Sequence, residues 1–147
     1  MDDPEVAALL HTHVTLARAA TAACSAHALD NAGLRAPDIA FYVAREAATL
    51  LSVGALKRLS AEQGEVKSMH TAQAGRGRGA GSAMLAHIVA QAKASGMSRL
   101  SLETGSADYF AAARRLYARH GFIECAPFGA YVPDRNSVFM TLDLRAS

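Results

Sequence analysis

The feature that most constrains this sequence is a glycine-rich run, Arg76-Gly77-Arg78-Gly79-Ala80-Gly81, which lies between a strand pattern and a helix pattern. Before it, residues 65–71 follow Gly64 and show the partial alternation of polar and apolar residues that is typical of a strand. After it, Gly96 supplies a helix stop, and the apolar positions between repeat at the spacing of one helical face: Met84, Leu85, Ile88, Val89 and Ala92. We therefore predict a strand, a glycine turn and a helix in succession.

A turn of this kind can bind phosphate. Free backbone N–H groups and the positive end of the helix dipole converge where a helix begins. Glycine allows the positive φ angles of such a turn and lets the backbone approach phosphate oxygens closely. Arg76 and Arg78 can add charge-assisted hydrogen bonds. The run is neither a Walker loop, because it lacks Gly-Lys-Ser/Thr, nor a dinucleotide fingerprint in good register with a ribose acid.

The rest of the chain predicts one domain of mixed strands and helices. The 147 residues are 51% hydrophobic and 19% charged, which fits a single globular domain with a sizeable core. We expect these elements: a helix at 4–19, a short helix or turn at 25–30, a hairpin of 39–43 and 50–56, strands at 65–71, 100–104, 121–126 and 137–144, and a second helix at 108–120. This order predicts an α/β (α+β) domain with helices on a central sheet and a strand-helix-strand crossover.

Charge and cysteine content exclude several classes of partner. A net charge of +2, with acidic residues interspersed, is too small to indicate nucleic acid or an anionic membrane.

The first residues are acidic where a signal peptide would be basic, and no apolar run reaches the roughly 18 to 20 residues that span a bilayer. Cys24 and Cys125 share no CxxC spacing, so we expect reduced, buried cytoplasmic thiols. The histidines have no metal-ligand spacing, and we expect no metal.

Two motifs together carry a family resemblance. Arg76, Gly79 and Gly81 match the pattern Arg/Gln-x-x-Gly-x-Gly/Ala, and Leu-Tyr-x-x-x-Gly-Phe follows at residues 116–122, at the end of the next predicted helix. Over roughly residues 3–144 the chain resembles the GNAT superfamily of acetyl-CoA-dependent N-acetyltransferases. Four segments are similar to a bacterial subgroup, the YsnE-type acetyltransferases: residues 25–30, 67–71, 102–106 and 136–140.

The resemblance implies a fold, a donor and a site for it. It implies a mixed, mostly antiparallel central sheet flanked by helices, with acetyl-CoA as the acetyl donor substrate. The glycine turn would hold the pyrophosphate, and the backbone of residues 68–71 would pair with pantetheine and supply an oxyanion donor. The coenzyme-binding residues would be Ser68, Met69, His70, Thr71, Arg76, Gly77, Arg78, Gly79, Ala80, Gly81, Ser82 and Tyr117.

One departure from the family concerns the start of the chain. GNAT domains normally open with a strand, whereas a helix is expected here almost from Met1. Either the sheet lacks that strand or the true start lies upstream. A missing strand would leave an open sheet edge near the hairpin, and exposed edges tend to be paired or covered, so we expect a homodimer.

The resemblance also implies direct attack of a primary amine on acetyl-CoA in a ternary complex. Glu65 lies 11 positions before Arg76, which resembles the spacing of the general-base glutamate in some histone-acetylating relatives; otherwise it is a solvated strand-end residue. Tyr117 occupies the place where the family tyrosine often faces the coenzyme sulfur, and it would protonate the leaving thiolate; otherwise it is a core residue. His70 is an alternative group for proton transfer, or a structural histidine.

The acceptor is less constrained by the sequence. Candidate residues for an acceptor pocket are His27, Asp30, Glu103, Tyr131, Asp134 and Asn136. Acidic members of this set favour a cationic small-molecule or peptide amine, whereas Arg115 or Arg135 would favour one that bears a carboxylate. A non-catalytic acyl-CoA-binding sensor would keep the glycine turn and need no tyrosine at position 117. An RNA-binding domain is disfavoured, because the Arg-Gly run has no neighbouring aromatic residues for base stacking.

Overall fold

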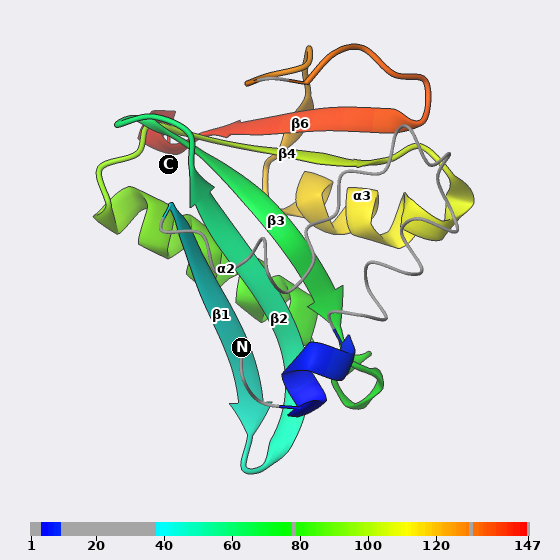
Figure 1. Ribbon diagram of the computed structural model, residues 1–147. Coiled ribbons are helices and arrows are strands. Elements are labelled where there is room, and N and C mark those ends of the chain that lie inside the picture. Colours follow the sequence, from blue (N-terminus) through cyan, green and yellow to red (C-terminus); the bar gives the residue numbers. More distant parts are fainter. Residues whose placement is uncertain (1–3, 10–37, 78, 130, 147) are drawn as a thin grey trace.

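The computed structural model describes residues 4–9, 38–77, 79–129 and 131–146, and these form a six-stranded sheet with helices packed against it (Figure 1). The order in the sheet is β1-β2-β3-β4-β6-β5. The strands are β1 (Ile39–Glu46), β2 (Thr49–Arg58), β3 (Gln63–Thr71), β4 (Arg99–Gly105), β5 (Ile123–Glu124) and β6 (Ser137–Asp143). Only β3 and β4 are parallel, so the predicted mixed, mostly antiparallel sheet is confirmed.

The first two strands form the predicted hairpin, and both are longer than the apolar runs that indicated them. Glu46 pairs with Thr49, which leaves Ala47 and Ala48 as a two-residue turn. Ala47 has a φ of 55°, the left-handed conformation that tight hairpin turns require. Among the described residues β1 pairs with β2 alone and forms one edge of the sheet. The homodimer that we expect from such an edge stays a prediction.

The strand-helix-strand crossover is also confirmed. Strand β3 is followed by the short 3-10 turn η3 (Gln73–Gly75), the helix α2 (Ala80–Ala94) and then β4. The helix buries Met84, Leu85, Ile88 and Ala92, the face that the apolar spacing predicted. These residues pack with Leu100 and Leu102 of β4 in the main hydrophobic core.

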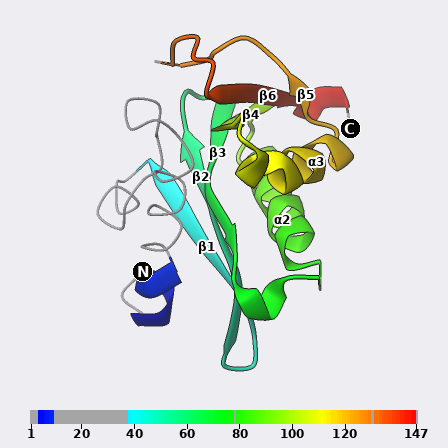
Figure 2. The ribbon, with the colours of Figure 1, turned by 90° about the vertical axis from the view of Figure 1, so that its right-hand side faces the viewer.

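The second amphipathic helix begins later than its sequence pattern indicates. Residues Asp108–Phe110 form a 3-10 turn, η4, and the α-helix α3 covers Ala111–Arg119. Arg114 donates hydrogen bonds to the backbone carbonyls of Gly105 and Ala107, which fixes α3 to the end of β4. Figure 2 shows α2 and α3 on one face of the sheet and the helical residues 4–9 on the other. None of the described helices is long and apolar enough to cross a membrane.

Three expectations about secondary structure and burial are wrong or concern residues that the structure does not describe. The strand expected at 121–126 is only Ile123–Glu124, because the chain pairs with β6 for two residues and then reaches Pro127, which has no N–H to donate. Cys125 is a free thiol but is partly exposed rather than buried. The helix expected at 4–19 is seen at 4–9. Residues 10–37 lie outside the described part of the chain. They include the rest of that expected helix, Cys24, the element expected at 25–30 and the place of any strand between residue 9 and β1.

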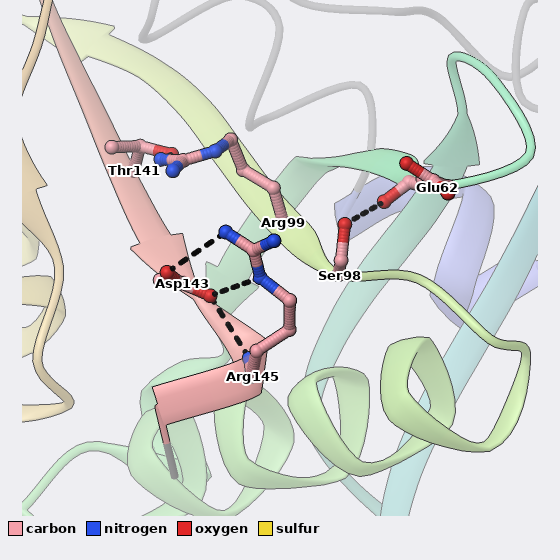
Figure 3. Close-up of polar contacts among 6 residues, drawn as sticks. All are labelled: Glu62, Ser98, Arg99, Thr141, Asp143 and Arg145. Carbon is pink, nitrogen blue, oxygen red and sulfur yellow. Dashed lines mark hydrogen bonds and ion pairs between the residues drawn. The ribbon is translucent and has the colours of Figure 1, made fainter.

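The last described residues, 144–146, lie beside the starts of β3 and β4, where polar contacts are found (Figure 3). After β6, residues Leu144–Ala146 form a last 3-10 turn, η5. The Asp143 carboxylate accepts hydrogen bonds from the backbone N and the guanidinium of Arg145. Ser98 donates to the backbone oxygen of Glu62. Backbone hydrogen bonds from Ser98 to Glu62 and from Leu144 to Ser98 also join the segments at this end of the sheet.

The opposite end of the sheet opens between its two parallel strands. Strand β3 pairs with β4 from Gln63↔Arg99 to Val66↔Leu102, although β3 continues to Thr71 and β4 to Gly105. Figure 1 shows the two strands separating along this stretch. The register between β2 and β3 also shifts here, so that Ser68 and Met69 both lie opposite Gly54. This bulge adds one residue to β3, and a bulge bends the strand that carries it.

Candidate active site

The glycine turn lies where the sequence places it, between the end of β3 and the start of α2. Gly77 and Gly79 have φ angles of 73° and 77°, and Gly79 is the N-cap of α2. No side chain among the described residues caps this helix start, and the first turn of α2 holds no acidic residue. The first N–H groups of an α-helix have no partner within the helix, so this end can receive an anion. The predicted strand-turn-helix arrangement is confirmed; Arg78 lies outside the described residues.

Gly81 is needed for close packing of the first turn of α2. A Cβ at this position would lie 3.0 Å from Thr71 Oγ1 and 3.4 Å from Leu116 Cδ2, atoms of β3 and α3. The next residue, Ser82, lies 2.8 Å from His120 through Oγ and Nε2. Sequence reasoning missed the contact with His120, because its partners are 38 positions apart and no local pattern joins them. The start of α2 is thus held against both neighbouring elements.

Glu65 is buried in a cluster of three polar side chains. Its Oε2 accepts hydrogen bonds from the Tyr131 hydroxyl at 2.6 Å and from Lys67 Nζ at 3.1 Å. Lys67 Nζ also donates to the Tyr131 hydroxyl at 2.9 Å. The exposed fractions of the Lys67 and Glu65 side chains are 9% and 4%. The solvated strand-end interpretation of Glu65 is therefore wrong, since the side chain lies under the loop that carries Tyr131.

The polar cluster lies at the opening of the sheet. Glu65 is opposite Ser101 on β4, and Lys67 is one residue past Val66, the last residue of β3 that pairs with β4. Sequence reasoning missed Lys67, although its spacing of two from Glu65 places both side chains on one face of a strand. Burial raises the pKa of Tyr131 above its ordinary value, and the charge and hydrogen bond of Glu65 and the charge of Glu103 raise it further. Tyr131 is therefore neutral and acts as a donor to Glu65.

The remaining acceptor candidates have mixed surroundings. Ser137 donates to Glu103 at 2.6 Å, which orients this carboxylate beside the cluster. Phe128, Tyr131 and Phe139 form a group of rings with centroids 5.1 to 6.0 Å apart. Asp134 accepts the backbone N–H of Asn136 at 2.9 Å, so these two residues shape a turn before β6. His27 and Asp30 lie outside the described residues.

Tyr117 lies in the main core. It is 7% exposed, and its ring meets that of Phe122 edge-on with the centroids 6.0 Å apart. Burial raises the pKa of its phenol above the ordinary value, so the hydroxyl stays protonated at neutral pH. The packing interpretation thus describes the ring, and the catalytic role of the hydroxyl stays a prediction.

His70 is held in its neutral form. Burial lowers the pKa of this imidazole below its ordinary value, and the positive charge of Arg76 lowers it further. Among the described residues, no group of three or more His, Cys, Asp or Glu side chains is arranged to hold a metal ion.

The lowered pKa of His70 predicts an acid-side loss of stability. Because the unfolded chain takes up this proton at a higher pH, the free energy of unfolding should fall as the pH drops from about 6.5 through the lowered value. One such group contributes a slope of at most about 1.4 kcal/mol per pH unit. Urea unfolding at pH 7.5 and 5.5 should show a smaller loss in His70→Asn than in the wild type. Equal losses in His70→Asn and in the wild type would contradict the assignment.

The fold and the glycine turn define the class of protein. A family model described as an acetyltransferase (GNAT) domain matches residues 37–124, and the chain belongs to this family of acetyltransferases. It is 42% identical to the uncharacterized N-acetyltransferase YsnE of Bacillus subtilis over 140 residues. These residues are 95% of this chain and 93% of the relative. The resemblance that the motifs indicated is therefore confirmed.

Solved structures agree with this family. A protein from Klebsiella pneumoniae assigned to the acyl-CoA N-acyltransferases superposes with a TM-score of 0.80 at 28% identity, over 97% of this chain and 92% of its own. A GNAT family acetyltransferase from Elizabethkingia anophelis, solved with acetyl-CoA bound, has a TM-score of 0.62 at 17% identity, over 72% of this chain and 76% of its own. At that identity the second likeness concerns the fold.

Proposed function

We propose that this acetyltransferase moves an acetyl group from acetyl-CoA to a primary amine of a small molecule or peptide, by direct attack in a ternary complex. The observation that carries the proposal is the uncapped start of α2, with Gly77 and Gly79 at positive φ, beside the opening between β3 and β4. A ligand with phosphates at one end and a thioester at the other suits this arrangement.

The donor would lie along the open part of β3. Its phosphates would bind residues 76–82, where the helix dipole, Arg76 and the backbone N–H groups attract negative charge. Its pantetheine would pair with residues 68–71, because the β4 side of this segment has no strand partner among the described residues. The thioester would then reach the part of the opening that lies beside Glu65 and Lys67.

The reaction needs one base and one acid. The lone pair of the amine nitrogen forms the C–N bond to the thioester carbon, and the carbonyl π electrons move to oxygen. Their return breaks the C–S bond and releases the coenzyme A thiolate. We assign Glu65 as the base that accepts the amine proton. Within the described part of the chain its two hydrogen bonds both end on Oε2, which leaves Oε1 for the substrate. We assign the proton donated to the thiolate to Tyr117; water restores both groups.

The placement of the phosphates can be tested with two matched glycine variants. Gly79 and Gly96 have φ angles of 77° and 82° at opposite ends of α2, and a Cβ at either position would meet nothing within 4 Å. Both Gly→Ala changes should therefore cause a similar backbone strain of about 1–2 kcal/mol. Gly79→Ala should in addition weaken acetyl-CoA binding about 10- to 100-fold, the loss of one hydrogen bond to a charged group.

Titration calorimetry with acetyl-CoA measures this difference. Gly96→Ala should bind as the wild type does, since it lies far from the proposed phosphates. Unchanged affinity in Gly79→Ala, or an equal loss in both variants, would show that the phosphates do not bind at the start of α2.

A further inference from the structure

Ser68 combines two unfavourable features at one position of β3. Its φ is 57°, a left-handed conformation that few residues other than glycine adopt. The residue is buried, with 8% of its surface exposed, and its Oγ is the only buried side-chain polar atom of the described residues without a hydrogen-bond partner. Strained backbone and unsatisfied polar groups both persist in folded proteins mainly where function requires them.

Other buried serines of the same sheet have partners. Ser52 Oγ donates to the backbone oxygen of Ala80 at 3.4 Å, and Ser101 Oγ lies 2.9 Å from Thr141 Oγ1. The sheet therefore satisfies buried hydroxyls elsewhere, and the missing partner is particular to position 68.

The position of Ser68 indicates what the partner is. Ser68 is the second residue after Val66, where the pairing of β3 with β4 ends, and it belongs to the bulge opposite Gly54. On one side along β3 is Lys67, bonded to Glu65; on the other the strand runs to Thr71 and the glycine turn. In the proposed function the thioester lies between the pair of Glu65 and Lys67 and the glycine turn, next to Ser68.

We propose that the Ser68 hydroxyl is a catalytic hydrogen-bond donor to the acetyl carbonyl oxygen of acetyl-CoA, an inference that rests on the proposed function. The oxygen gains negative charge as the C–N bond forms and loses it as the C–S bond breaks. Ser68 keeps its proton throughout, so no atom is transferred to or from it. A preorganised donor in a site without water is most effective where charge develops in the transition state.

The first test measures the carbonyl itself and needs no acceptor amine. Acetyl-CoA labelled with carbon-13 at the acetyl carbonyl is bound to the protein, and its stretching band is recorded by difference infrared spectroscopy. We expect the band at lower frequency in the wild-type complex than in solution, and a return toward the solution value in Ser68→Ala. An equal frequency in both complexes would overturn the proposal.

The same experiment separates the two proposals. If acetyl-CoA does not bind to the wild-type protein, the proposed function fails and Ser68 has no substrate to bond, so both proposals are rejected. If acetyl-CoA binds but Ser68→Ala leaves the band unchanged, the assignment of Ser68 alone is rejected.

The second test separates catalysis from structure. With the amine that gives the fastest coenzyme A release in a screen of amines, Ser68→Ala should lower kcat about 100- to 1,000-fold, the range for loss of one oxyanion donor. The Kd for acetyl-CoA should change less than about twofold, because the lost bond strengthens only in the transition state. Its Tm should not fall, because the removed hydroxyl has no protein partner.

Two variants serve as controls. Ser101→Ala removes a buried hydroxyl that has a partner, so its Tm should fall while kcat is kept. Ser68→Gly relieves the positive φ and removes the hydroxyl, so it should have a higher Tm than Ser68→Ala and an equally low kcat. A weaker Kd with unchanged kcat in Ser68→Ala, or a fall in Tm like that of Ser101→Ala, would overturn the proposal.

Discussion

Replacing Tyr117 by phenylalanine is expected to lower kcat for acetyl transfer by about 100- to 10,000-fold, the usual effect of losing general-acid assistance. The change keeps the ring that packs in the core beside Phe122 and removes only the hydroxyl. Because burial raises the pKa of this phenol, it should remain protonated and able to donate even at pH 9. The Kd for acetyl-CoA should change little, since the hydrogen bond is needed when the thiolate departs.

Tyr42→Phe provides the matched control for this prediction. Tyr42 lies on the edge strand β1, away from the opening between β3 and β4, and its ring contacts His87 of α2. Tyr42→Phe therefore also removes one phenol hydroxyl, but at a distance from the proposed site. We expect this variant to keep its kcat. Near-normal turnover of Tyr117→Phe under conditions where chemistry limits the rate would show that Tyr117 only packs, and that water or His70 supplies the proton.

Replacing Lys67 by methionine is expected to reduce the free energy of unfolding by about 3–5 kcal/mol. The change removes the cation 3.1 Å from Glu65 and leaves a carboxylate with 4% exposure bonded only to the Tyr131 hydroxyl among the described residues. Methionine keeps the length and most of the packing of the lysine stem. The loss in the free energy of unfolding therefore comes from the unpaired buried charge of Glu65. Urea unfolding at pH 7 measures this loss.

Two further variants test this explanation. Removing both charges in Glu65→Gln/Lys67→Met should recover most of the lost stability, because a neutral pair needs no compensating charge. Arg145→Met breaks the exposed pair with Asp143 shown in Figure 3 and should change stability little, since water screens both groups. Equal stability of Lys67→Met and the wild type would mean that the Glu65 carboxylate reaches solvent.

The parts of the fold that the sequence predicted are those specified by local patterns. The alternation in residues 65–71, the glycines at 77 and 79 and the apolar face of residues 84–92 each constrain their own segment through side-chain period or backbone φ. Their order then leaves the parallel crossover as the simplest topology. The extent of β5 was predicted wrongly, because it depends on how far β6 can pair and not on residues 121–126 themselves.

By itself the sequence determined the family, the order of the strands and helices, and the turn that we propose for the phosphates. All three depend on residues close together in the chain. Only the tertiary structure showed that Glu65 is buried, that Lys67 and a tyrosine 66 positions away share its carboxylate, and that the hydroxyl of Ser68 has no partner among the described residues. Burial and hydrogen bonding depend on which segments the folded chain brings together, and the sequence around one residue does not contain that information.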